Sequence, residues 1–171
     1  MTLEQLVIGL IRVVGSLPVL RWAFAGALIA IVVDFSDLFL QEALELGGLR
    51  NYQAFDKWID IVYMLAFLWV ANRWNGMERT VAIGLFVFRM IGFITFELTG
   101  ARPILLTFPN VFEFWFVFVA IRLHYWPNYE MNRSRIIKWL IICSTLKLGQ
   151  EWVLHGGRYL DSFTFFEAVT A

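Results

Sequence analysis

The chain has 171 residues, of which 60% are hydrophobic and 16% are charged. A soluble domain has roughly 45–50% apolar and about 25% charged residues, so this composition excludes an ordinary soluble domain and indicates an integral membrane protein. The formal net charge is zero, which argues against nucleic acid as a partner, and the single Cys143 excludes an internal disulfide.

The first predicted element is an amphipathic helix over residues 2–15. Its apolar residues, among them Leu6, Leu10 and Val14, recur at helical spacing. We expect such a helix to lie along the membrane surface, with its apolar stripe in the lipid. Pro18 follows shortly after and ends it.

Five apolar segments follow, each close to the ~20 residues that cross about 30 Å of hydrocarbon. They are predicted over residues 19–40, 55–74, 80–98, 104–121 and 136–154. Glycine, asparagine and proline in the connections are typical of turns. The last segment, residues 159–171, is predicted to lie at the membrane interface. The sequence therefore predicts one all-α integral membrane domain, a bundle of five transmembrane helices plus the N-terminal amphipathic helix.

Lysine and arginine favour one orientation of this bundle. Eight of them, Arg12, Arg21, Arg73, Arg79, Arg122, Arg133, Arg135 and Lys138, fall on one predicted side, and four fall on the other. The side with more basic residues is expected to be cytoplasmic. This predicts an N-terminus inside, a C-terminus outside, and a location in the cytoplasmic membrane of a prokaryote.

Acidic and amide side chains gather toward the outer end of every predicted span. The set comprises Asp34, Asp37, Asp56, Asp60, Glu97, Asn110, Glu113, Gln150, Glu151 and His155. Several are three or four residues apart, so they share a helix face. Charge inside a bilayer costs at least about 2.5 kcal/mol per group, and such groups by default mark a site. The pattern therefore predicts a polar cup that faces the outside.

The predicted cup contains more acids than bases, because seven carboxylates oppose Arg89, Arg102 and Lys147. Carboxylate and amide oxygens are ligands for Mg²⁺, Ca²⁺ and Mn²⁺. The candidate metal ligands are Asp34, Asp37, Asp56 and Asp60, with Glu97, Glu113 and Glu151 next, while Arg89 and Lys147 orient or neutralise them. An alternative for these two cations is an ion pair that joins helices. No haem or nucleotide motif is present.

The spacing of the four aspartates carries a partial family resemblance. Asp34-Phe-Ser-Asp37 followed by Asp56-Lys-Trp-Ile-Asp60 resembles the paired-aspartate motif of CDP-alcohol phosphotransferases, although the glycines and the arginine of that motif are absent. The resemblance implies a divalent metal bound by these aspartates and a lipid-modifying activity in which the last aspartate acts as base.

Three functions remain open on the sequence. The first is a cation-binding membrane protein, such as a small transporter or channel-like protein. The second is a metal-dependent lipid-modifying enzyme, and the third is a structural or assembly subunit of a larger membrane complex. The expected partners are the lipid bilayer and either further copies of the chain or such a complex.

Overall fold

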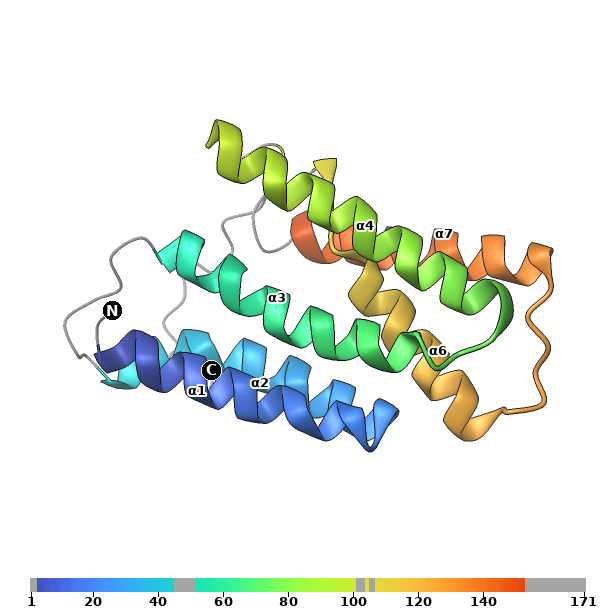
Figure 1. Ribbon diagram of the computed structural model, residues 1–171, viewed down its shortest axis with the longest axis horizontal. Helices are drawn as coiled ribbons and strands as arrows, with labels where there is room; N and C mark the ends of the chain where they lie inside the picture. The colour runs from blue at the N-terminus through green and yellow to red at the C-terminus, as the bar shows by residue number, and fades with distance from the viewer. Residues whose placement is uncertain (1–2, 45–51, 101–103, 105–106, 153–171) are drawn as a thin grey trace, which may run out of the picture.

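The computed structural model describes residues 3–44, 52–100, 104 and 107–152, and over these residues the protein is all-helical, as predicted (Figure 1). The elements are α1 (Leu3–Ser16), η1 (Leu17–Leu20), α2 (Ala23–Leu44), α3 (Tyr52–Ala71), α4 (Gly76–Thr99), α6 (Val111–Tyr125) and α7 (Arg133–Glu151). The predicted tail at 159–171 lies outside the described residues.

The N-terminal helix is part of the bundle, so its predicted position along the membrane surface is wrong. α1 packs against α2 and α3, and the short η1 reverses the chain, so that Gly15 lies against Val33. The start of α1 therefore lies beside the end of α2, opposite the connections that carry most basic residues (Figure 1). The prediction that the N-terminus shares the basic side is not supported.

α1 packs into the bundle because its two faces differ in polarity. Ile8, Arg12 and Ser16 are spaced four apart and are buried, whereas Leu10 and Val14 of the predicted stripe are exposed. These two residues of the stripe face outward, whereas the side chain of Leu6 lies outside the described residues. The opposite face carries Arg12, whose charge is paired with carboxylates on neighbouring helices.

α6 is the central helix of the bundle, since it packs against α2, α3, α4 and α7. Trp115, Phe112 and Phe116 on this helix are fully buried. Phe116 stacks on Phe67 and Trp74 of the α3 side, with ring centroids 4.2 and 5.1 Å apart. Such offset aromatic pairs add to the apolar burial and hold α6 against the end of α3.

The outer surface of the bundle is strongly apolar. Large hydrophobic side chains are exposed on α1, α2, α3, α4 and α7, for example Val32, Leu65, Trp69, Ile94 and Ile141. The buried polar or charged residues are Arg12, Ser16, Glu78, Asn110, Glu113, Arg122 and Lys147. The exterior of the described bundle is therefore apolar on most helices, and its interior is an apolar core that also encloses these few polar side chains.

The prediction of five membrane spans is not supported. Over the described residues, one helix, α4, is long and apolar enough to cross a membrane by length and composition, and apolar runs on other helices, such as 58–71, are shorter. α6 has only 15 residues because Pro109 delays its start to Val111. α7 contains four lysines or arginines, which lower its hydropathy.

Gly26 is a position where the fold leaves no space for a side chain. A Cβ at Gly26 would overlap the backbone of Pro18 and Val19. We expect Gly26→Ala to lower the free energy of unfolding by about 1–3 kcal/mol, the usual cost of overpacking. The measurement is thermal unfolding in detergent. Gly84→Ala is the matched control, because its Cβ would meet open space, and an equal loss in both variants would contradict this assignment.

Candidate functional site

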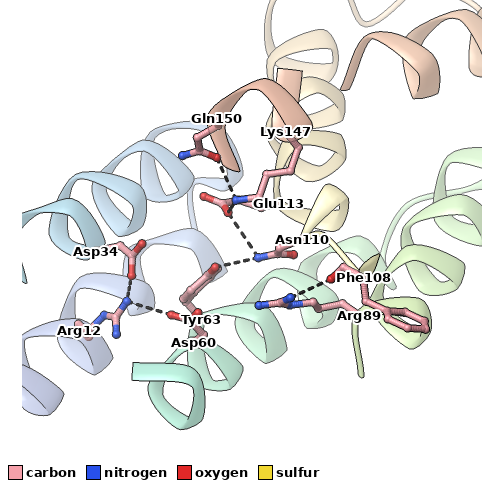
Figure 2. Close-up of polar contacts among 10 residues, drawn as sticks. All are labelled: Arg12, Asp34, Asp60, Tyr63, Arg89, Phe108, Asn110, Glu113, Lys147 and Gln150. Carbon is pink, nitrogen blue, oxygen red and sulfur yellow. Dashed lines mark hydrogen bonds and ion pairs between the residues drawn. The ribbon is translucent and has the colours of Figure 1, made fainter. Parts of the chain in front are cut away.

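A buried layer of polar side chains crosses the bundle and joins five helices (Figure 2). We define this polar layer by eight residues: Arg12, Asp34, Asp60, Tyr63, Asn110, Glu113, Lys147 and Gln150. They come from α1, α2, α3, α6 with its preceding turn, and α7. Every one of them has a polar contact with another member.

Arg12 is shared by two carboxylates from two other helices. Its guanidinium forms an ion pair with Asp34 of α2, and its Nη2 donates to Asp60 Oδ1 of α3 at 2.9 Å. Arg12 is only 6% exposed. A buried arginine is stable when its charge is paired and its donors are used, so this contact fixes α1, α2 and α3 to one another.

The other half of the polar layer is a chain of contacts from α3 to α7. Asn110 Nδ2 donates to the Tyr63 hydroxyl at 3.0 Å and lies 3.4 Å from Glu113 Oε2. Lys147 Nζ lies 3.9 Å from the same Glu113 oxygen and donates to Gln150 Oε1 at 2.9 Å. The amide oxygen of Asn110 is buried and accepts no hydrogen bond from the residues that the structure describes.

Arg89 lies beside the polar layer and reaches the segment that precedes α6. Its Nη1 donates to the carbonyl oxygen of Phe108 at 2.8 Å (Figure 2). Phe108 can lie this close to α4 because Gly92 has no side chain in its way. Arg89 therefore stabilises the non-helical turn before Pro109, where a backbone carbonyl has no helical partner.

The structure brings together six of the residues that the sequence assigned to the cup, namely Asp34, Asp60, Asn110, Glu113, Lys147 and Gln150. Glu97 is exposed near the end of α4 and does not belong to the buried layer. Arg102 and His155, and the side chains of Asp37, Asp56 and Glu151, lie outside what the structure describes.

The charges described in the polar layer do not make it an acidic cup. Arg12 compensates Asp34 and Asp60, and Lys147 compensates Glu113. Arg89 adds a further positive charge at its edge. Among the described residues, no group of three or more His, Cys, Asp or Glu side chains could hold a metal ion. The predicted metal site therefore has no support from this part of the chain.

A second buried ion pair lies at the other end of the molecule. Glu78, in the first turn of α4, pairs with Arg122, in the last turn of α6. Trp115 Nε1 donates to the Glu78 carbonyl at 3.2 Å and holds the same turn. Glu78 was not predicted as a site residue, and Arg122 was predicted only as one of the basic residues on the cytoplasmic side. Both are nevertheless more than nine-tenths buried.

A long apolar cavity of about 650 Å³ runs between α6 and α7, with Ile31 of α2 in its wall. Its polar residues are few. Glu113 and Gln150 belong to the polar layer, whereas Arg122 and Tyr129 lie toward the connection of α6 and α7. The remaining lining is Phe114, Val117, Phe118, Ile121, Trp126, Trp139, Ile142, Cys143 and Leu146.

A polar cavity of about 610 Å³ adjoins it, and Arg122 and Tyr129 line both. Its other lining residues are Arg73, Trp74, Asn75, Glu78, Leu123, Pro127, Asn128, Glu130 and Met131. These residues come from the connection of α3 and α4 with the first turn of α4, and from the end of α6 with its connection to α7. An apolar cavity thus lies next to a polar one, which we call its mouth, with Arg122 and Tyr129 in the walls of both.

No protein-family model matches the chain, and no curated protein or solved structure matches it. The resemblance to CDP-alcohol phosphotransferases therefore rests on the spacing of four aspartates and stays a prediction. Of these, the two with described side chains, Asp34 and Asp60, both contact Arg12, a partner that would compete with a metal ion.

We expect removal of Arg12 to destabilise the protein, because it leaves two carboxylates inside the bundle without compensation. Arg12→Met should lower the free energy of unfolding by about 3 kcal/mol, the lower end for a broken buried pair, since Asp34 keeps a side-chain exposure of 33%. Chemical unfolding in mixed micelles measures this.

Two controls distinguish charge pairing from side-chain size. Arg21→Met removes an exposed arginine and should be neutral within about 0.5 kcal/mol. The triple variant Arg12→Met, Asp34→Asn, Asp60→Asn should recover most of the lost stability. If the triple variant is less stable than Arg12→Met alone, the carboxylates do not need the arginine.

Proposed function

We propose that this chain is an integral membrane protein that binds a hydrophobic molecule in the apolar cavity between α6 and α7. The single observation that carries the binding proposal is the cavity itself. It is large, apolar and aromatic along its walls, and polar only where Glu113, Gln150, Arg122 and Tyr129 lie.

The apolar exterior of the bundle supports the membrane setting. Contiguous exposed apolar surface on most helices would drive aggregation in water but suits contact with lipid. α4 has 24 residues, and only 17% of its most apolar stretch is buried. The apolar runs on α2 and α3, Ala23–Asp34 and Trp58–Ala71, are shorter, so α4 is the helix whose length best matches the hydrocarbon thickness of a bilayer.

The size and chemistry of the cavity support a ligand of drug or lipid size. Ligand pockets have volumes of about 300–1,000 Å³, apolar walls and a few polar groups that set orientation. The cavity of about 650 Å³ falls in this range. Phe118 and Trp139 stack with ring centroids 4.3 Å apart in its wall, so a rigid aromatic surface is available for contact.

Cys143 provides a built-in reporter for this binding, because it is the only cysteine and lines the cavity. Cys143 is only 3% exposed, so its alkylation by a membrane-permeant maleimide is slow in the free protein, and we expect a bound hydrophobic molecule to slow it further, by at least about tenfold. Mass spectrometry of protein in detergent, with and without added lipid, measures the rate.

Two variants test whether the thiol is protected by a molecule inside the cavity. Val117→Trp, on the opposite wall, should fill the cavity and slow alkylation without ligand. Ile141→Cys in a Cys143→Ala background places a thiol on the exposed face of α7, where protection should be absent. Equal protection at positions 141 and 143 would indicate a general detergent effect and contradict binding in the cavity.

A cation site is a second candidate, and the buried amide oxygen of Asn110 favours it. This oxygen accepts no hydrogen bond from the described residues. The nitrogen of the same amide lies 3.4 Å from Glu113 Oε2. Amide oxygens are among the ligands that hard cations prefer, so a cation here would bind the Asn110 oxygen.

Thermal unfolding tests the cation site. With Mg²⁺, Ca²⁺ or Mn²⁺ at about 100 times its dissociation constant, the folded state should gain about 2.7 kcal/mol. The gain should disappear in Asn110→Ala and persist in Asn72→Ala, which changes an exposed asparagine. No gain with any of the three cations would reject this candidate and leave the binding of a hydrophobic molecule unaffected.

A further inference from the structure

We infer that the molecule bound between α6 and α7 is an anionic amphiphile, with its tail in the apolar cavity and its headgroup in the adjoining polar cavity. This inference rests on the proposed function and adds the class of the ligand and its orientation. The occupant is a membrane lipid or lipid-like molecule with a phosphate-type headgroup.

The two cavities adjoin each other. Arg122 and Tyr129 line the apolar cavity and the polar cavity alike. Glu113 and Arg122, which mark the two ends of the apolar cavity on α6, are nine residues apart, or about 13 Å along a helix. An extended hydrocarbon tail fits such a cavity, and the polar cavity of about 610 Å³ has the volume for a headgroup.

The basic residues around the mouth complement an anionic headgroup. The end of the molecule at which η1, α3 and α6 connect to the following helices carries seven basic residues: Arg21, Arg73, Arg79, Arg122, Arg133, Arg135 and Lys138 (Figure 1). The acidic residues described there are Glu78 and Glu130. An excess of positive charge attracts an anionic headgroup, and arginine pairs with phosphate oxygens in a fixed, bidentate geometry.

One arginine of the lining has donors available for a headgroup. Arg73 is exposed, and its Nη1 makes a long contact of 3.3 Å to the Leu20 carbonyl. An arginine has five N–H donors, so Arg73 can bind an anion while keeping this contact. Arg122 is 7% exposed and is already paired with Glu78, so Arg73 is the residue expected to bind the headgroup.

The other end of the apolar cavity disfavours the reverse orientation. Glu113 lines that end and is compensated by Lys147 within the polar layer. A phosphate placed there would compete for a lysine that is already engaged. The polar cavity is lined by two carboxylates, Glu78 and Glu130, but Glu78 is paired with Arg122, and the seven basic residues at that end outnumber the two acids. The mouth therefore favours the headgroup, and the polar layer favours the tail.

The test uses the full-length protein in detergent and follows alkylation of Cys143. The probes are dioctanoyl phosphatidic acid, dioctanoyl phosphatidylcholine and inorganic phosphate. We expect phosphatidic acid to protect Cys143 at a concentration at least about tenfold lower than phosphatidylcholine, because the two differ in headgroup charge at equal chain length. Inorganic phosphate, which has no tail, should give no protection.

Arg73→Gln should remove most of this preference. It should raise the protecting concentration of phosphatidic acid about tenfold and leave that of phosphatidylcholine unchanged. Arg79→Gln is the matched control, because Arg79 is exposed at the same end but does not line the polar cavity. It removes the same charge, and it should change the protecting concentration of phosphatidic acid by less than about threefold.

The outcomes distinguish the inference from the proposed function. Equal protection by the two lipids, unaffected by Arg73→Gln, would reject the inference of an anionic headgroup and would still support a site for a hydrophobic molecule. Protection by inorganic phosphate would overturn the amphiphile in favour of a free-anion site. No protection by either lipid would overturn binding in the cavity itself.

Discussion

The fold depends on one guanidinium that two carboxylates share. Arg12 reaches Asp34 and Asp60 from a third helix, so α1, α2 and α3 have a single relative setting in which all three charges are compensated. Apolar contacts alone tolerate sliding and rotation of helices, whereas a buried charge left without its partner is costly. The contact of Glu78 with Arg122 does the same for α4 and α6, where α4 begins and α6 ends, so two separate ion pairs fix two sets of helices.

Between the polar layer and the pair of Glu78 with Arg122, α6 contributes aromatic side chains to the core on one face and lines the apolar cavity on the other. In the proposed membrane setting, lipid covers the apolar exterior and the polar groups turn inward, where they find one another. A hydrophobic ligand between α6 and α7 would then move from lipid into the protein without passing through water.

Composition and turn residues were enough to predict the helices, and the direction of α1's apolar stripe, but not the partners of the charges. Asp34, Asp60, Asn110, Glu113, Lys147 and Gln150 share a layer because helices of similar length placed them at similar depth. The sequence does not give the rotation of each helix, so it could not pair Arg12 with Asp34 and Asp60. The spacing of Ile8, Arg12 and Ser16 was the available signal, since a buried apolar residue one turn away places Arg12 on the inner face. Proline geometry at Pro109 moved the start of α6 away from the hydropathy boundary.

The hairpin of α1 and α2 has a consequence for biogenesis. Arg12 has its partners on helices that are synthesised later, because Asp34 and Asp60 follow it by 22 and 48 positions in the chain. In the proposed membrane setting, insertion of α1 alone would release an arginine into lipid, at a cost of at least about 2.5 kcal/mol. We therefore expect α1 to remain at the insertion site until α2 emerges, so that in this setting the two enter the bilayer together as a neutralised pair and α3 joins them afterwards.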